Sequence, residues 1–275
     1  MKCLNSSETI LCAALLLTFW GTAHAAADPV RGSKIDVANL VRQSAKVTES
    51  DRKAGLEFDC NEKIWQPDGS YKTYAVLMLY GSPYNELIAV NGKPLSKAEA
   101  EEQQRKMQQE ISKRQHESPQ EREQRFAEYD KQQNRDRHFI TDFVQAFNFK
   151  LIGQGKLDGR PVYIVQAMPR RDYRPPDSDA AALRGMEGRL WIDKSTYQWV
   201  KAQAHVVHPV SIHGFVATVE PGTDFILEKR PVAPGVWLPK HFTMNAKAKI
   251  FGFFDHKRHE DVTFFNYHKA TQSAD

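Results

Sequence analysis

The chain has 275 residues, and its charges nearly balance, with 38 Lys and Arg against 34 Asp and Glu. A chain of this length can bury a substantial core, in one large domain or in two small ones. The formal net charge of +4 is small, and the basic residues are interspersed with acidic ones. This distribution argues against a nucleic-acid-binding protein.

The first 25 residues have the features of a secretory signal peptide. Lys2 precedes a continuous apolar run over residues 10–20, and the Ala-His-Ala sequence at residues 23–25 matches a small-x-small cleavage site. The apolar run is too short to span a bilayer comfortably. We therefore expect residues 1–25 to be removed on export.

Cysteine usage limits how the exported chain can be stabilised. Cys3 and Cys12 lie in the leader, so Cys60 alone remains. One cysteine cannot form an intramolecular disulfide, and packing must hold the fold together. Asp59 and Glu62 flank Cys60, and negative charges raise the pKa of a thiol. We expect a buried structural cysteine, not a nucleophile.

The segment after the leader predicts one helix followed by strands. Apolar residues recur at near-helical spacing over residues 35–50, which indicates an amphipathic helix. Two strand-like segments then flank the Pro-Asp-Gly sequence at residues 67–69, and a third strand ends at Asn91 and Gly92. Both sequences are typical of hairpin turns.

Residues 96–138 form a highly charged insertion. Capping-box sequences at residues 96–99 and 118–121 predict helices over residues 97–116 and 119–137. Sizeable apolar side chains are few, so each helix has a thin docking stripe. Two interpretations stay open, a solvated helical hairpin on the surface and a mobile lid or partner-binding arm.

The remainder of the chain is rich in strand patterns. A short apolar helix is expected over residues 139–147, followed by a hairpin that turns at Asp158 and Gly159. A Pro- and Arg-rich loop covers residues 169–176. Two strands then meet at a turn near Lys194. Four more strands are expected near residues 211–220, 223–230, 236–251 and 257–268.

These strands alternate apolar and polar residues, as expected for an antiparallel sheet covered on one side. Lys201, Gln203 and His205 share the polar face with Trp199. The residues that we expect on the apolar face are Leu190, Ile192, Val200, Ala202, Ala204, Val206, Phe225, Leu227, Met244, Ala246, Ala248 and Ile250. Four of them are alanines. Because protein interiors are close-packed, either a helix approaches closely there or volume is left for a ligand.

Four stretches of this sequence resemble the LolA/LolB-like superfamily of periplasmic lipoprotein and lipid carriers. They are YNELIAVNGKPLS, GRPVYIVQAMPR, GRLWIDKSTYQWVKAQAHV and GVWLPKHFTMNAKAKIFGF. The resemblance extends over about residues 35 to 268. The strand-turn-strand sequence LWIDKSTYQWVKA is its most typical part, and no single residue is diagnostic. The charged insertion departs from the small carriers of this superfamily.

The resemblance implies an α+β fold, a curved and unclosed antiparallel β half-barrel with helices over its concave face. We expect a single such domain over residues 26–275, with the helical insertion at 96–138. In relatives, acyl chains or lipidated termini occupy the space between sheet and helices. The twelve apolar-face residues are therefore the candidate ligand-binding set, and the cavity becomes the better interpretation of the alanines. The aromatic residues of the last strands, among them Phe253, could line it or close its rim.

The function that follows is a periplasmic carrier in outer-membrane biogenesis that holds a lipid or a lipidated protein segment. Its partners would be lipid or lipoprotein acyl chains and an inner- or outer-membrane protein, with no nucleic acid, and we expect a monomer. The alternative is an envelope sensor or protein-interaction module without a transported ligand. RseB-like sensors of the same superfamily use a similar domain.

Patterns for catalysis or metal binding are weak. His256 and His259 are three residues apart on an expected strand, where their rings would point to opposite faces and could not converge on a metal. No GxSxG sequence occurs. The glycine-rich stretch at 153–159 lacks the dinucleotide-binding spacing. We expect no enzyme, no catalytic residue, no metal and no cofactor.

Overall fold

The sheet is the framework of the molecule. The computed structural model describes residues 35–212, 217–250 and 253–271, and the signal peptide expected over residues 1–25 lies outside them. Asp36–Asp275 form one compact unit. Its strands build a 13-stranded antiparallel sheet. The strands are β1 (Phe58–Trp65), β2 (Tyr71–Leu79), β3 (Ser82–Val90), β4 (Lys93–Pro94), β5 (Phe147–Leu157), β6 (Arg160–Pro169), β7 (Met186–Asp193), β8 (Trp199–Val206), β9 (Val210–Ile212), β10 (Ala217–Val219), β11 (Asp224–Ala233), β12 (Val236–Ile250) and β13 (Phe254–Lys269).

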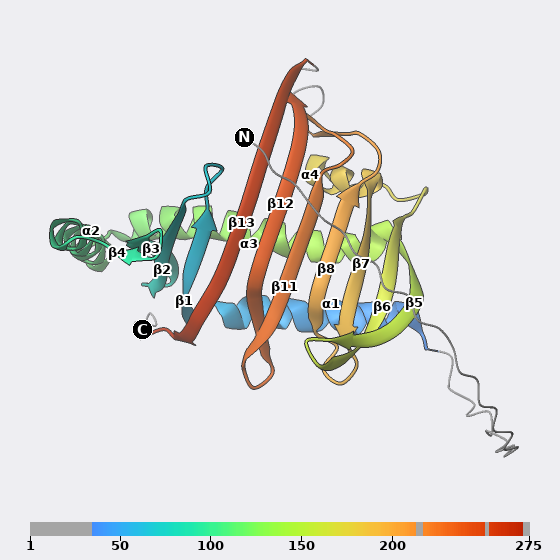
Figure 1. Ribbon diagram of the computed structural model, residues 1–275, viewed down its shortest axis with the longest axis horizontal. Helices are drawn as coiled ribbons and strands as arrows, with labels where there is room; N and C mark the ends of the chain where they lie inside the picture. Colours follow the sequence, from blue (N-terminus) through green and yellow to red (C-terminus); the bar gives the residue numbers. More distant parts are fainter. Residues whose placement is uncertain (1–34, 213–216, 251–252, 272–275) are drawn as a thin grey trace, which may run out of the picture. The chain divides into compact units, whose positions relative to one another are not determined.

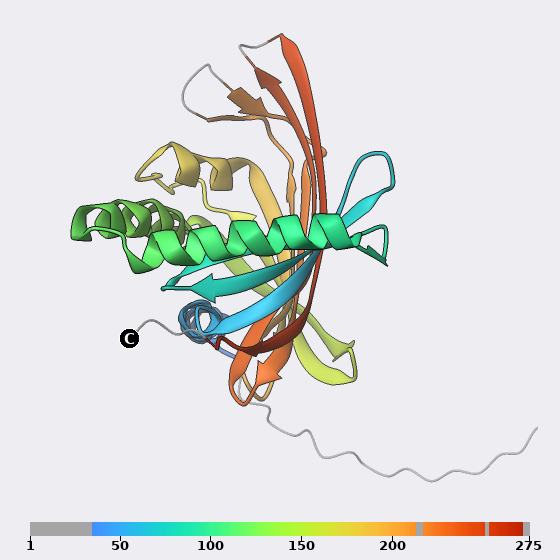
Figure 2. The same ribbon diagram turned by 90° about the vertical axis from the view of Figure 1, so that its left-hand side faces the viewer.

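The strand order leaves the sheet open. Neighbours run β4-β3-β2-β1-β13-β12-β11-β8-β7-β6-β5, and β10 adds to β12 and carries β9. The first and last strands of this path do not pair with each other in the described residues. Figure 2 shows the strands bending around the helices. The expected α+β class and unclosed antiparallel half-barrel are confirmed.

Helices cover one face of the sheet. They are α1 (Val37–Gly55), α2 (Lys97–Gln115), α3 (Pro119–Ala146), the short α4 (Ser178–Ala181) and the 3₁₀ turn η1 (Ala182–Gly185). Figure 1 shows α1 and α3 crossing behind the strands, and α1 contacts β5, β12 and α3. The apolar residues Leu40, Val41 and Ala45 of α1 are buried, which accounts for the near-helical spacing in the sequence.

The helix starts agree with the capping sequences. The Ser96 hydroxyl accepts the Glu99 backbone N–H, and the Ser96 backbone N–H donates to the Glu99 carboxylate at 2.9 Å. Ser118 and Glu121 repeat the arrangement at the start of α3. Each capping box satisfies backbone donors that a helix start leaves free. Both predicted helix starts are confirmed.

Several boundaries differ from the sequence-based expectation, and three of these differences concern the later part of the chain. The helices expected over 119–137 and 139–147 are one helix, Pro119–Ala146, because the change from charged to apolar residues is not accompanied by a helix-breaking Gly or Pro. The strand expected over 211–220 is described as β9 and β10, with residues 213–216 outside the described part. The last strand begins at Phe254, earlier than the expected residue 257.

The hairpin turns follow their sequences. Asn91 and Gly92 both have positive φ, 51° and 74°, and so do Asp158 and Gly159, at 49° and 77°. Two successive residues with positive φ are the mark of the type I′ turn, which asparagine, aspartate and glycine accept at little cost. These turns hold β3 to β4 and β5 to β6 in register.

Candidate ligand-binding site

An apolar cavity of about 330 Å³ lies between the covered face of the sheet and the helices. Strands β7, β8, β11 and β12 supply one side, and α3 and η1 supply the other. The residues around it are Phe143, Phe147, Ala182, Leu183, Met186, Glu187, Gly188, Arg189, Leu190, Trp199, Ala202, Gln203, Ala204, Phe225, Leu227 and Phe242. Its volume falls within the range of roughly 300–1,000 Å³ that small-molecule sites occupy.

Small residues make the floor of this cavity. Gly188 pairs with Ala204, and Leu190 pairs with Ala202, across β7 and β8. A Cβ atom at Gly188 would lie 2.7 Å from the backbone oxygen of Gln203, so a side chain there would require the backbone to shift. Glycine and alanine therefore leave the volume between these strands and the helices open.

Larger apolar side chains make the walls and roof. Phe225 pairs with Ala204, Leu227 with Ala202, and Phe242 lies opposite Leu227. The ring of Phe143 lies 5.0 Å from that of Phe147 and 5.6 Å from that of Trp199. The cavity is therefore enclosed by aliphatic and aromatic groups contributed from positions far apart in the chain.

Polar side chains on the same strands alternate with the apolar ones. Lys201 Nζ is 3.1 Å from a carboxylate oxygen of Glu228 across β8 and β11. His205 Nε2 is 4.0 Å from Glu187 Oε2 across β7 and β8. Cross-strand pairs of this kind place the polar groups on the face opposite the helices. The expected division into one apolar and one polar face holds over this part of the sheet.

Five of the twelve candidate residues border the cavity, and the structure places the others elsewhere. The five are Leu190, Ala202, Ala204, Phe225 and Leu227. Ile192 is fully buried. Val206 belongs to a core cluster with Leu183 and Met186. Met244, Ala246 and Ala248 are partly buried and do not border the cavity, and the side chain of Ile250 lies outside the description.

Val200 is displaced by a β-bulge. Trp191 pairs with Lys201, yet the next pair is Ile192 with Trp199, so Val200 has no partner residue on β7. A bulge reverses the alternation that precedes it. Trp199, expected on the polar face, therefore borders the cavity, and Val200 packs with Val162 and Trp237 in a separate cluster.

Sequence reasoning missed several of the residues that border the cavity. Phe242 and Gly188 continue the alternations of Met244 and Leu190 by two residues, and Met186 continues that of Leu190 by four, so a longer reading of the same pattern would have included them. Trp199 was hidden by the bulge. Phe143, Phe147, Ala182 and Leu183 come from a helix end and a 3₁₀ turn that strand alternation does not address.

The structure locates Cys60 and His259, two of the residues considered for chemistry in the sequence. Burial, together with the charges of Glu62 and Asp59, raises the pKa of the Cys60 thiol to about 12, which confirms the buried, unreactive cysteine expected from the sequence. His259 Nδ1 lies 2.7 Å from Asn245 Oδ1. Within the described residues, no three His, Cys, Asp or Glu side chains are grouped as a metal site would require.

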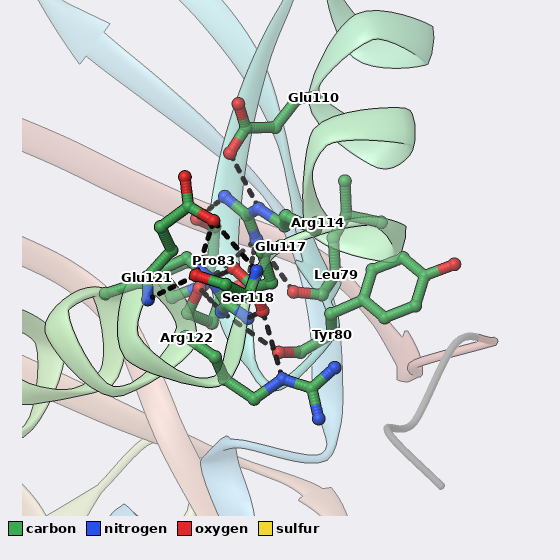
Figure 3. Close-up of polar contacts among 11 residues, drawn as sticks. Leu79, Tyr80, Pro83, Glu110, Arg114, Glu117, Ser118, Glu121 and Arg122 are labelled. Atoms are coloured by element: carbon green, nitrogen blue, oxygen red, sulfur yellow. Dashed lines mark hydrogen bonds and ion pairs between the residues drawn. The ribbon is translucent and has the colours of Figure 1, made fainter.

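Two arginines attach the charged insertion to the sheet at the β2–β3 turn (Figure 3). Arg114, a buried residue of α2, donates to the backbone oxygens of Leu79 at 2.7 Å and Ser82 at 2.8 Å. Arg125 of α3 donates to the backbone oxygen of Tyr80 at 3.0 Å and to the Ser82 hydroxyl at 2.7 Å. We call these contacts the arginine clasp.

A second polar cluster attaches α1. The buried carboxylate of Asp51 accepts from Lys229 Nζ at 2.5 Å, Gln198 Nε2 at 3.0 Å and the Trp237 backbone N–H at 2.9 Å. Burial lowers the pKa of Lys229, and the Asp51 carboxylate opposes that shift. Nearby, Trp199 Nε1 donates to Ser44 Oγ at 3.0 Å. We call Asp51 and the three residues that donate to its carboxylate, Lys229, Gln198 and Trp237, the Asp51 cluster.

Comparison with known proteins gives likenesses of fold. No family model and no curated protein matches the chain. Among solved structures, the chain is similar to a LolA superfamily protein from Nitrosomonas europaea, at 10% identity and a TM-score of 0.33, over 87% of this chain and 96% of that one. It is also similar to a domain described as an outer membrane lipoprotein-sorting protein from Vibrio parahaemolyticus, at 10% identity and a TM-score of 0.31, over 84% and 94%.

A further similar structure is the MucA/MucB complex of Pseudomonas aeruginosa, at 10% identity and a TM-score of 0.25, over 86% of this chain and all of that chain. At such identities and TM-scores these similarities assign no function to the chain. A proposal about its function has to rest on the cavity itself.

Proposed function

We propose that the protein binds a lipid acyl chain, free or attached to a protein segment, in the cavity between β7, β8, β11 and α3. One observation carries the proposal. The cavity has a floor of glycine and alanine and walls of leucine and phenylalanine, and the surface that it offers a ligand is almost entirely apolar. Apolar cavities of this kind stay dry and accept apolar molecules.

The size of the cavity suits part of an acyl chain. Its 330 Å³ is about twice the roughly 150 Å³ of an engineered apolar cavity that holds benzene, which corresponds to about ten to twelve carbon atoms. Burying about ten methylenes at roughly 0.8 kcal/mol each contributes about 8 kcal/mol before ordering costs. A bound chain would then be retained through purification.

The cellular role is part of the same proposal. The signal peptide expected over residues 1–25 and the superfamily resemblance support a periplasmic carrier whose cargo is a lipid or a lipidated protein. No helix among the described residues has the length and apolar character needed to cross a bilayer. If no lipid is bound, the alternative is a sensor or interaction module that engages a protein partner through its insertion.

The test compares two alanines that the sequence alone made equivalent. Ala202 borders the cavity, whereas Ala248, on β12 of the same sheet, does not. The wild-type protein, Ala202→Phe and Ala248→Phe should be purified, extracted with organic solvent and analysed by mass spectrometry. We expect lipid from the wild type and from Ala248→Phe, and at least a tenfold loss from Ala202→Phe, because a phenyl ring fills the floor.

Circular dichroism of both variants would establish that the sheet is retained. The proposal is overturned if Ala202→Phe carries as much lipid as Ala248→Phe. It is equally overturned if the wild type yields no lipid and takes up none when incubated with fatty acids.

A further inference from the structure

The tip of the β12–β13 hairpin exposes a pair of aromatic side chains. Phe253 and Phe254 are 71% and 60% exposed, and no other large apolar residue in the described part of the chain reaches those values. Their ring centroids are 4.4 Å apart. Phe253 was a candidate, by sequence, for lining or closing the cavity, yet it lies at a hairpin end and does not border it.

The hairpin carries these rings beyond the end of β1. β1 pairs with β13 only as far as Val262, so residues 254–261 of β13 have β12 as their partner strand in the described pairings. Figures 1 and 2 both show β12 and β13 extending well beyond β1 and β11. The other edge of β12 is paired with β10 at residues 248–250. The two phenylalanines at the end of these strands nevertheless leave an exposed apolar surface.

Positive charge lies directly behind the tip. Lys247, Lys249 and Lys257 are exposed, and Asp255 lies directly across the hairpin from Lys249. Lys247 is paired directly across the two strands with Lys257. Like charges at such a position destabilise a hairpin. An anion bound beside the two lysines would remove that repulsion.

We infer that this hairpin docks on an anionic phospholipid surface, with Phe253 and Phe254 in the boundary between headgroups and acyl chains. The Lys247–Lys257 pair lies three residues from the tip, which is about 10 Å at the rise of a strand. That distance brings the lysines to the headgroup phosphates when the rings are inserted at the boundary. The inference does not depend on a ligand in the cavity.

A lipid surface fits this tip better than a second protein does. A stable protein interface needs roughly 800 Å² from each partner, and two phenyl rings on a narrow hairpin cannot supply that area. A bilayer accepts a small apolar wedge, because aromatic side chains favour its interfacial region and anionic headgroups attract nearby lysines. The chemistry of the tip therefore points to lipid.

The apolar part of the inference is tested by flotation with vesicles of phosphatidylcholine containing phosphatidylglycerol. The variant Phe253→Ser/Phe254→Ser should lower the vesicle partition coefficient by about tenfold or more, since two aromatic side chains lose their transfer into the boundary region. The matched control is Ile152→Ser/Met168→Ser, which removes two exposed apolar residues elsewhere in the sheet. It should partition like the wild type.

The contribution of the lysines is tested in the same flotation experiment with the variant Lys247→Gln/Lys257→Gln. The control variant, Lys97→Gln/Lys106→Gln on α2, removes the same number of positive charges elsewhere. The hairpin variant should lose roughly fivefold in binding per lysine. Its melting temperature should be unchanged or higher, because a like-charge pair is removed. High salt, or vesicles of phosphatidylcholine alone, should abolish the difference between the two variants.

Three results would overturn the inference. One is wild-type protein that does not float with anionic vesicles. Another is a serine variant that binds as well as its control. The third is light scattering that shows the wild type as a dimer and the Phe253→Ser/Phe254→Ser variant as a monomer, which would assign the tip to a second copy of the chain. Ala202→Phe should still bind vesicles, so failure of the cavity proposal and failure of this one are distinguishable.

Discussion

Two polar attachments hold helices on the same sheet, and they differ in what surrounds them. The Asp51 cluster ties α1 to the β7–β8 turn, β11 and β12, and the side chains of its ion pair, Asp51 and Lys229, are 3% and 6% exposed. The arginine clasp ties α2 and α3 to one hairpin turn through guanidinium groups and backbone oxygens. The first is an enclosed charge pair beneath a helix. The arginine clasp contacts the sheet at a single turn, between β2 and β3, near one edge of the sheet.

This difference predicts how much of the folded structure is destabilised when one of the two attachments is removed. A buried charge that loses its partner destabilises the whole folded state, because no solvent replaces the partner. A turn at the end of a sheet can open without the rest. We therefore expect the Asp51 cluster to govern global stability and the arginine clasp to govern the local docking of the insertion.

The largest effect is expected from Asp51→Ala. It leaves the Lys229 ammonium buried without its counter-charge, which should cost about 3–5 kcal/mol of unfolding free energy. Asp36→Ala is the control on the same helix, since it removes the exposed N-cap that accepts from the Asn39 backbone N–H, a loss of about 1 kcal/mol. Chemical denaturation measures both. Equal losses of unfolding free energy from the two variants would contradict the prediction that the Asp51 cluster governs global stability.

A smaller and local effect is expected from Arg114→Ala. The backbone oxygens of Leu79 and Ser82 lose a charged donor, and hydrogen bonds to charged groups contribute about 1.5–3 kcal/mol each. Hydrogen exchange should accelerate in α2 and change little in α1. Arg105→Ala, which removes an exposed arginine of α2 paired with Glu102, should leave both helices protected. Equal acceleration in α1 and α2 would show that the clasp is a global contact.

The smallest effect is expected from Glu117→Gln, and it depends on pH. A hydrogen bond from Arg125 lowers the pKa of Glu117, and Arg122 adds to the shift. A lowered carboxyl pKa stabilises the fold above the ordinary value of 4.5, and the contribution is lost as the pH falls through the folded-state pKa. Near pH 7 the variant should melt roughly 1–3 °C below the wild type.

The difference in melting temperature should close when the two proteins are compared in acid, at a pH below the lowered pKa of Glu117, because the wild-type side chain is then protonated as well. Glu101→Gln, at an exposed position facing Lys97, should show no gap at either pH. A difference in melting temperature that persists in acid would mean that the Glu117 side chain stabilises the fold through its shape and not through its charge.

Much of the fold could be predicted because its signals are local. Capping boxes and the Asn-Gly and Asp-Gly turns each depend on a few adjacent residues, and all of them form as expected. The end of α3 was different. The boundary drawn near residue 138 followed a change of composition, whereas a helix continues until its backbone meets a breaker or a competing contact.

The cavity could be predicted only in part, because its walls meet through pairing across strands. Alternation identified Ala202, Ala204 and Leu190, which share one face of β7 and β8. It failed at Val200, since a bulge is a property of two paired strands and leaves little trace in either one alone. Strand alternation could not identify Phe143 and Leu183, because they belong to a helix and a 3₁₀ turn.

The bare floor at Gly188 restricts how this binding site could change in the course of evolution. A residue that already lacks a side chain cannot be trimmed further, and any addition there collides with the adjacent backbone. Room for a longer or branched guest would have to come from shortening Leu227 or Phe242, and selectivity for a shorter guest from enlarging Ala202 or Ala204. Chain-length preference is therefore adjustable at the walls and at the alanines of the floor, whereas the floor cannot be deepened at Gly188.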